Sequence, residues 1–580
     1  MSQNMFNNQK STFSEIIKTI KEDRFTQVFI LMLIFGGIIR YYGITNAENT
    51  DEYNEVFEAL RVASGKFNFN RWFKKGYQNI LAIEYGFYFI IGYLLNIFSS
   101  PMDFAAKVVR NMEPLFLIGR YTTATLGTLS IGLVYLIGRK LYNGRVGLLA
   151  ALLLTVNSIH VWTSHLVNTD VPLLFFFLLS FYFICRFYET GMLSDYIYAA
   201  MFGAIAINVK TMGIGIGIVF VLGHIIRCIN EKRRYINYVF CREMMWSFVA
   251  FIAAFALSNP PIIIGIKQFI VYHLQVYTNV YDEVPYAIDD NGYYTYLLIL
   301  YNEMGVPLFL SIIAGLGYAL YKRENWDIIL LIFIIGMYCL LSGTTFLIQD
   351  RYLMVIFPAL YLLTGRMVDS FLTRYASLAK RKAPALLIIS IILCIHPAVT
   401  SLKYVRTLTE KNTSIISKRW IEENIPAGSK ILIDAGHTMI TSGPRISQSW
   451  ERLEAQLNII KDLKEGETYD SRYVRIVDSY SSIYFELLLQ NMPEITYNIT
   501  TTELGRQLES VEYYKENGFD YFIHNEDMIY RIDDPLWRDK YPKSAQFYDS
   551  FKHSYTLIKS FDPSPTRSGP DIKIYKINQL

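Results

Sequence analysis

The chain has 580 residues, of which 52% are hydrophobic and 18% charged, and its formal net charge is +4. A soluble protein of this length would carry about 25% charged residues, so the composition excludes an ordinary soluble enzyme. The small net charge gives no reason to expect a nucleic-acid partner.

The deficit of charge is concentrated in the first 402 residues, where uncharged runs long enough to cross a bilayer recur. The N-terminal 24 residues are polar and lack the pattern of a signal peptide, so we expect the first span to be retained as an anchor. We predict a polytopic α-helical membrane protein with about eleven transmembrane helices. They are expected at 25–43, 120–138, 146–163, 171–186, 195–209, 211–227, 244–258, 305–321, 328–346, 352–366 and 384–402.

The orientation follows from the basic residues. With the N-terminus in the cytoplasm, twenty lysines and arginines fall in the inner segments, and only Lys210, Lys267 and Arg351 fall in the short outer loops. This positive-inside bias predicts an integral plasma (inner) membrane protein with a cytoplasmic N-terminus. The apolar run 85–98 would invert the bias if it crossed the membrane. We therefore predict an interfacial helix there, within a long outer loop at 44–119.

The sequence becomes mixed and polar after residue 402, and stretches such as WIEENIPAG, SKILIDAG and DYFIHNED alternate between helix and strand patterns. We predict a membrane domain at 1–402 and an extracytoplasmic α/β domain at 403–580. A second outer loop is expected at 259–304, rich in tyrosine. Gly292 is its candidate hinge, and the loop is either a cover over the substrate or an aromatic belt on the lipid.

Carboxylates and isolated cations gather on the predicted outer side. The first outer loop begins with ENTDEYNE, which contains Asp51 and Glu52, and Asp170 lies in the short loop after the third span. Ionisable groups at membrane depth indicate function by default. A carboxylate can take a proton from an attacking hydroxyl, and cations can stabilise a departing phosphate. The candidate cations are Arg120, Lys210 and Arg351.

Each candidate also has a structural interpretation. Asp51 and Glu52 would then be solvated loop acids, as we expect of Glu48 and Glu55, and Asp170 would be a helix N-cap. Lys210 and Arg351 would be snorkelling anchors, and Arg120 would pair with an acid for structure alone.

Metal binding is not indicated by any spacing. A site could be assembled from His165 with Asp170, or from His273 with Asp282 and Glu283, but neither pattern is specific for a metal. We expect these to be ordinary polar histidines and predict that no cofactor is required, since fixed cations can replace a divalent metal.

The ordered set of motifs resembles a known family. TDE after the first span, NTDVPLLFFF after the third, RYLMVIFPALYLL late in the membrane domain and WIEENIPAGSKILID at the start of the tail are similar to the GT-C membrane glycosyltransferases. The closest group contains the protein O-mannosyltransferases and the aminoarabinose transferases of lipid A. Three features differ: IEYGFYF replaces a Pro-rich stretch, the soluble insertion of eukaryotic protein mannosyltransferases is absent, and no WWDYG motif occurs.

The resemblance implies an inverting transfer of one sugar from a polyprenyl-phosphate donor to a lipid, glycan or protein acceptor on the outer face. It implies that Asp51 is the catalytic acid with Glu52 beside it, and that Asp170 positions the acceptor or the base. Arg351, Arg120 and, by a weaker match, Lys210 would bind the donor phosphate. Tyr53, His165 and Tyr352 would line the donor and acceptor loops. The alternatives are a transporter or flippase of lipid-linked glycans, and an envelope scaffold; the absence of a sequence duplication disfavours the transporter.

Overall fold

The computed structural model describes residues 24–48, 51–63, 76–260, 267, 292–343, 348–374, 382–434, 443–462, 487–502, 505, 507–526 and 532–577. The chain divides into two compact units. The first, here the membrane unit, comprises Met1–Tyr42, Phe67–Asn79 and Tyr121–Tyr404, and the second, the outer unit, comprises Gly43–Lys66, Ile80–Arg120 and Val405–Leu580. The segment that follows the first predicted span therefore groups with the C-terminal tail.

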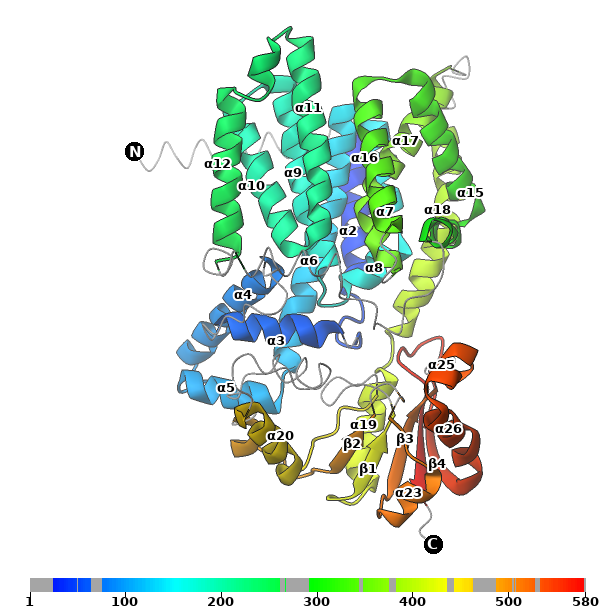
Figure 1. The fold of residues 1–580 in the computed structure, drawn as a ribbon. Helices are drawn as coiled ribbons and strands as arrows, with labels where there is room; N and C mark the ends of the chain where they lie inside the picture. The colour runs from blue at the N-terminus through cyan, green and yellow to red at the C-terminus, as the bar shows by residue number, and fades with distance from the viewer. Residues whose placement is uncertain are drawn as a thin grey trace. The chain divides into compact units, whose positions relative to one another are not determined.

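Long helices dominate the membrane unit (Figure 1). Every segment predicted as a span coincides with a helix, although the bounds differ. The helices are α2 (Arg24–Tyr41), α6 (Glu113–Leu141), α7 (Gly144–Thr155), α8 (Ser158–Ser164), α9 (Asp170–Thr190), α10 (Leu193–Val209), η1 (Thr211–Gly215), α11 (Ile216–Asn230), η2 (Tyr235–Tyr238), α12 (Arg242–Ser258), α15 (Gly292–Lys322), α16 (Asn325–Ser342), η3 (Asp350–Val355), α17 (Phe357–Arg374) and α18 (Lys382–Thr407).

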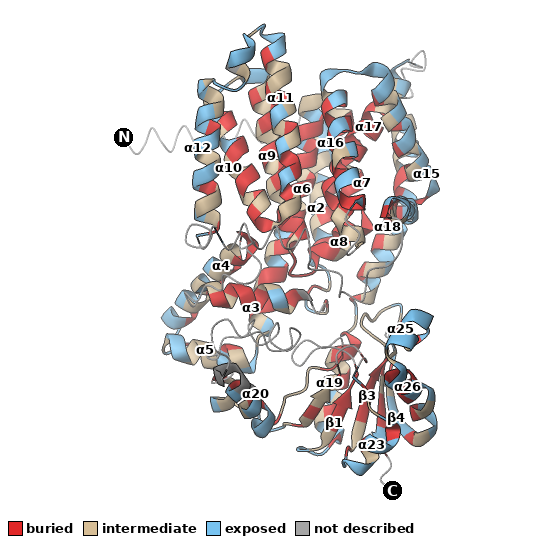
Figure 2. Cartoon of the chain, viewed as in Figure 1, coloured by how far each residue is buried: buried red, intermediate tan, exposed pale blue. Residues whose placement is uncertain are grey.

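Figure 2 shows exposed residues along α12, α15 and α18 of this unit, and many of them are large and apolar. Leu257 of α12 is 79% exposed, Leu310 of α15 58% and Leu387 of α18 62%. Exposed apolar surface of this extent on long helices is the surface that a bilayer covers. Among the described residues, six helices are long and apolar enough to cross a membrane, and a bent pair would make a seventh. The predicted membrane fold is confirmed, whereas the number eleven stays a prediction.

Two predicted segments differ in shape. The run 146–163 is not one straight helix, because α7 and α8 meet at an angle of 61°. Asn157 causes the break, since its side chain accepts a hydrogen bond from His160 N and starts a new helix. In the predicted loop 259–304, residues 292–304 form the first part of α15, and residues 261–266 and 268–291 lie outside the described residues. Gly292 is buried at the start of this helix.

The outer unit contains short helices before its sheet: α3 (Asp51–Ala63), α5 (Pro101–Arg110) and part of α4 (Gly76–Leu94). The interfacial helix predicted at 85–98 corresponds to α4, which begins nine residues earlier and ends at Leu94. α4 is not among the helices that meet the criterion for a membrane span.

The tail forms an α/β domain around one five-stranded sheet. Its elements are α19 (Thr413–Asn424), β1 (Lys430–Ile433), α20 (Trp450–Asp462), β2 (Asn498–Thr501), α23 (Val511–Glu516), β3 (Tyr521–Asn525), α25 (Pro535–Lys540), α26 (Pro542–Ser554), β4 (Tyr555–Phe561) and β5 (Ile572–Ile577). The strand order is β2-β1-β3-β5-β4. β1 pairs in parallel with β2 and β3, whereas β5 pairs antiparallel with β3 and β4. The predicted C-terminal α/β fold is confirmed.

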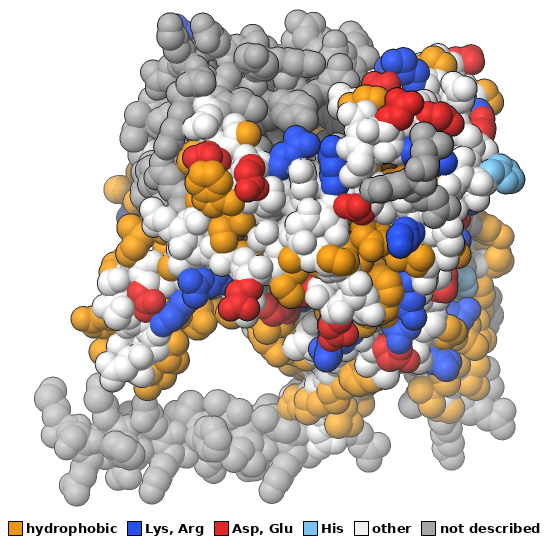
Figure 3. Space-filling view, turned by 90° about the horizontal axis from the view of Figure 1, so that it is seen from below, with side chains coloured by type: hydrophobic (Ala, Val, Ile, Leu, Met, Phe, Trp, Pro, Cys, Tyr) orange, Lys and Arg blue, Asp and Glu red, His pale blue; other side chains and the backbone are white. Residues whose placement is uncertain are grey.

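Alternation along the strands makes two cores, one on each face of the sheet. One core contains Leu432, Phe522 and Tyr575 with aromatic side chains of α26. The other contains Ile433, Ile523 and Ile574 with Ile421 of α19. Outside these cores, acidic and basic side chains are mixed on the face drawn in Figure 3 rather than gathered by sign.

Candidate active site

A buried carboxylate and a cation meet where α9 begins and α10 ends. Asp170 is the first residue of α9, and Lys210 follows the last residue of α10. These are the favourable positions for each charge, because a helix dipole is positive at its N-terminus and negative at its C-terminus. Lys210 Nζ makes an ion pair with Asp170 Oδ1, and the two side chains are 15% and 4% exposed.

Asp170 does not cap its own helix. Asn168 does, since its side-chain oxygen accepts from Asp170 N at 2.9 Å and Val171 N at 3.4 Å. The same asparagine donates to Thr163 O at 2.5 Å. The capping interpretation of Asp170 is therefore wrong, and its carboxylate is available to bind cations.

Arg351 and Tyr352 complete this group, which we call the Asp170 cluster. Arg351 Nε lies 3.6 Å from Asp170 Oδ2 and donates to Gln349 Oε1 at 2.7 Å. Tyr352 places its ring 4.5 Å from Lys210 Nζ, a cation–π contact. The structure thus brings together four predicted site residues: Asp170, Lys210, Arg351 and Tyr352.

Two further carboxylates near this cluster were missed by the sequence interpretation. Asp350 accepts from Arg351 N at 2.7 Å, and burial raises the pKa of its carboxyl against the lowering effect of Arg351. Glu303 of α15 accepts a hydrogen bond from Ser158 Oγ. The position of Asp350 next to Arg351 was the only signal for it in the sequence.

Glu52 and Arg120 form a separate pair in the outer unit. Arg120 Nε donates to Glu52 Oε1 and Nη2 donates to Oε2, both at 2.8 Å. Both side chains are almost fully buried. A bidentate arrangement of this kind is strong and directional, and it orients α3 relative to the start of α6. The predicted roles of Glu52 in catalysis and of Arg120 in phosphate binding stay predictions.

Asp51 is the first residue of α3, and its side chain lies outside the described part of the structure. Its neighbours are described. Glu48 is not the surface acid that we expected, since its side chain is 12% exposed and lies 3.0 Å from Arg445 Nη1. Burial raises the pKa of Glu48, and Arg445 opposes that rise. Tyr53 also contacts Arg445, whose guanidinium lies 3.8 Å from the tyrosine ring.

The predicted loop residue His165 is buried among backbone groups. Its Nδ1 lies 2.8 Å from Val161 O, and its Nε2 lies 3.2 Å from Tyr42 O. These contacts match the expected structural histidine. The weak metal candidates His273, Asp282 and Glu283 lie outside the described residues. Within the described ranges, no group of three or more histidine, cysteine or acidic side chains could hold a metal ion.

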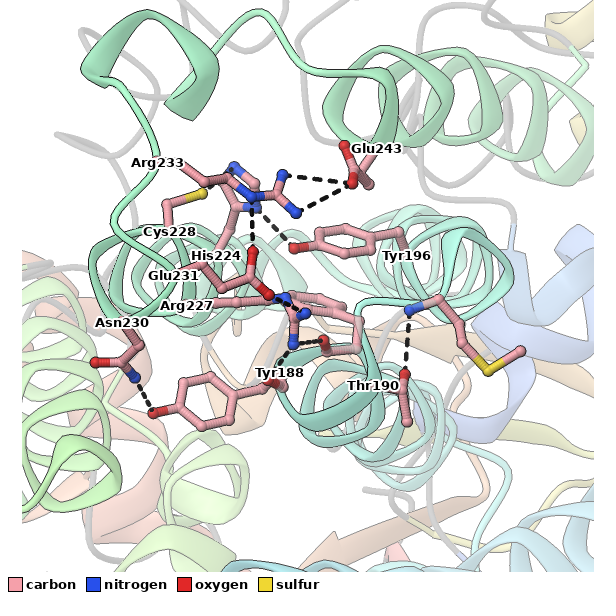
Figure 4. A network of polar contacts seen from close by, with 12 residues as sticks. Tyr188, Thr190, Tyr196, His224, Arg227, Cys228, Asn230, Glu231, Arg233 and Glu243 are labelled. Carbon is pink, nitrogen blue, oxygen red and sulfur yellow. Dashed lines mark hydrogen bonds and ion pairs between the residues drawn. The ribbon is translucent and has the colours of Figure 1, made fainter.

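A polar network lies at the C-terminal ends of α9 and α11 (Figure 4). It includes none of the predicted site residues. Arg227 donates to Phe187 O at 3.1 Å and Tyr188 O at 2.6 Å, which satisfies the last carbonyls of α9. Arg233 pairs with Glu231 at 2.6 Å and Glu243 at 3.4 Å. These contacts join helix ends, which is a structural role.

Comparisons with known proteins bear on the membrane unit. Residues 115–263 match the family model described as dolichyl-phosphate-mannose-protein mannosyltransferase. This segment contains Arg120, Asp170 and Lys210. Over these residues, the match confirms the resemblance to the protein O-mannosyltransferase group. No curated protein matches the chain.

Several solved structures also match the chain at low sequence identity. The oligosaccharyltransferase of Archaeoglobus fulgidus, tethered to an acceptor peptide, is 12% identical, with 97% of this chain and 75% of that chain covered and a TM-score of 0.49. The archaeal oligosaccharyltransferase AglB from Archaeoglobus fulgidus, in complex with an inhibitory peptide and a dolichol-phosphate, is 11% identical, with coverage of 97% and 75% and a TM-score of 0.48. ArnT from Cupriavidus metallidurans, bound to undecaprenyl phosphate, is 11% identical, with coverage of 96% and 98% and a TM-score of 0.46.

Proposed function

We propose that this protein is an inverting glycosyltransferase that moves a single sugar from a polyprenyl-phosphate donor to an acceptor on the outer face of the plasma membrane. The acceptor is a lipid, a glycan or a protein. The observation that carries the proposal is the Asp170 cluster, which holds two cations and an aromatic ring around one buried carboxylate. Such fixed cations suit a phosphate leaving group. The match of residues 115–263 to a family that uses dolichyl-phosphate-mannose supports the donor class.

In the proposed reaction, an acceptor hydroxyl attacks the anomeric carbon of the sugar. Asp51 takes the hydroxyl proton as general base, and the bond between the anomeric carbon and the phosphate oxygen breaks. Polyprenyl phosphate leaves with the bonding electron pair, and the configuration at the anomeric carbon inverts. Lys210 and Arg351 neutralise the phosphate, while Asp170 keeps both cations in place.

Transfer assays with membranes that contain the protein test this proposal. A panel of polyprenyl-phosphate sugars is supplied to the wild type and to Asp51→Asn. Loss of a general base costs about 10²–10⁴-fold, so the variant should lose transfer of the one accepted sugar. Asp103→Asn is the matched control: this acid of the same outer segment bonds Lys107 and the backbone of Ser99, and its loss should leave transfer unchanged.

Three results would contradict the proposal in different ways. Equal transfer by the wild type and Asp51→Asn would mean that another group is the base, and Asp170 would be tested next. Absence of transfer from every donor by the folded protein would refute the transferase. Movement of a lipid-linked glycan from one leaflet of a vesicle membrane to the other, without transfer of sugar to an acceptor, would favour the alternative flippase.

A further inference from the structure

Helix α3, which begins with Asp51, packs against a helix of the C-terminal tail. Tyr53, Phe57 and Leu60 recur at the spacing of one helix face; Phe57 clusters with Leu453 and Leu457 of α20, and Tyr53 and Leu60 pack against this cluster. Phe57, Leu453 and Leu457 are at most 8% exposed. The acidic motif therefore rests on the tail through a small apolar core inside the outer unit.

Arg445 of the tail adds polar contacts on both sides of Asp51. Its Nη1 lies 3.0 Å from Oε1 of Glu48, three residues before Asp51. It also donates to the hydroxyl of Tyr53, two residues after Asp51. One guanidinium thus joins the last described residue before α3 to the first turn of that helix.

Aromatic packing fixes the plane of this guanidinium. Arg445 stacks on Tyr53 at 3.8 Å, and the Tyr53 ring lies 4.6 Å from the ring of Phe116. Arg445 is also 5.8 Å from Phe116. A planar cation held between a carboxylate and an aromatic ring loses little freedom when it binds, so it is a rigid support.

We propose that Arg445 is a positioning residue for sugar transfer, which holds the beginning of α3 so that Asp51 is presented to the acceptor. This inference rests on the proposed function, in which Asp51 is the base. It gives the tail a definite task, because a base must be held close to its productive geometry. A displacement of about 1 Å can cost roughly 10²-fold in rate.

The Glu48 carboxylate makes the arrangement dependent on Arg445. Within the described part of the chain, Arg445 is the basic side chain in ion-pair contact with Glu48. A mostly buried carboxylate without its partner is unfavourable and moves toward water. Loss of Arg445 should therefore shift the segment before Asp51 as well as the first turn of α3.

The experiment compares Arg445→Ala and Arg445→Lys with Arg452→Ala. Arg452 is the matched control, since its guanidinium bonds Asn498 and Thr500 at the tail surface. We expect kcat of Arg445→Ala to fall about 10–100-fold while the donor KM changes little. Arg445→Lys should recover part of the loss, because an ammonium can pair with Glu48 but cannot stack as a plane on Tyr53. Arg452→Ala should behave as the wild type.

A second readout does not depend on activity. Asp51→Cys is labelled with a membrane-impermeant maleimide in otherwise wild-type protein and in protein carrying Arg445→Ala, and the labelling of the native cysteines is subtracted. Faster labelling in the Arg445→Ala background is expected, because the start of α3 is then released. Equal labelling rates, or wild-type kcat in Arg445→Ala, would overturn the positioning role. If the wild type transfers no sugar, the proposed function fails, and the labelling comparison still decides whether Arg445 holds α3.

Discussion

Asp170 is a nearly buried anion that two cations neutralise. The effect on stability of replacing either cation should therefore depend strongly on whether the Asp170 carboxylate is present. Removal of one partner from a buried ion pair typically costs about 3–5 kcal/mol, because the remaining charge has lost its compensation. Lys210→Met should therefore destabilise the membrane unit by about 3 kcal/mol. Arg351 lies 3.6 Å from the same carboxylate and would limit the loss.

The double variant separates charge from packing. Lys210→Met with Asp170→Asn removes both charges, so it should be less destabilised than Lys210→Met alone. Thermal unfolding in detergent would measure this, with Lys430→Met as the control, because the ammonium of Lys430 bonds a backbone carbonyl at the tail surface. If Lys210→Met lowered the unfolding temperature no more than Lys430→Met, the ion pair between Lys210 and Asp170 would not contribute to stability.

Residue types and helix ends explain which side chains could be predicted. An acid at the start of one helix and a lysine at the end of the next are visible in the sequence, and antiparallel packing of α9 on α10 brings them together. The partner of Arg120 was not visible. Adjacent residues of a helix do not share a face, so the sequence does not say which acid of an adjacent pair an arginine will meet, and the structure shows that Arg120 binds Glu52. Arg445 lies 392 residues from Tyr53, and no local pattern marks such a contact.

At the scale of elements, α15 contains a conformation that only glycine adopts readily. Gly305 has φ of 69°, and a Cβ there would lie 2.5 Å from the ring of His396 in α18. Gly305→Ala should destabilise the protein by about 1–3 kcal/mol through backbone strain and the clash. Gly317 of the same helix is the control, because nothing lies within 4 Å of its Cβ position and Gly317→Ala should be neutral or slightly stabilising. Equal unfolding temperatures for the two variants would contradict this.

Hydropathy predicted where helices occur but not how they bend. The run 146–163 is apolar enough overall that hydropathy predicts one helix. Asn157 nevertheless starts a second helix, which is bent by 61° from the first. The first part of α15 was assigned to a loop, because its polar tyrosines and Asn302 obscure the helical pattern. In both cases local capping and tertiary packing decide the shape of the helix. Hydropathy averaged along the sequence contains no information on either.

The sheet was easier to predict than its order. Lys430–Ile433 carries the short apolar run of a strand that is buried on both faces, and Ile572–Ile577 alternates isoleucine with lysine over part of its length. The order β2-β1-β3-β5-β4 depends on the path of the connections between strands. That path is decided by contacts between residues far apart in the chain.

At the scale of the whole molecule, the distribution of basic residues predicts which side of the membrane each part occupies. A cluster at Lys232, Arg233 and Arg234 lies in the loop between α11 and α12, whereas the predicted short outer loops hold only Lys210, Lys267 and Arg351. Alkaline phosphatase reports orientation, because it needs disulfides that form only outside the cytoplasm. A fusion after Leu580 should be active, and a fusion after Arg234 should be inactive. A fluorescent protein that folds only in the cytoplasm should give the opposite pattern.

This orientation decides which donor chemistry the enzyme can use. If the tail lies outside, the acidic motif that shares its unit lies outside as well, on the side where nucleotide sugars are absent and a lipid-linked donor is needed. An active phosphatase fused after Arg234, with an inactive one after Leu580, would place the acidic motif in the cytoplasm. The requirement for a polyprenyl-phosphate sugar would then lose its physical reason, even if Asp51 proved to be essential. The fusion pair therefore tests the donor class independently of any assay of transfer.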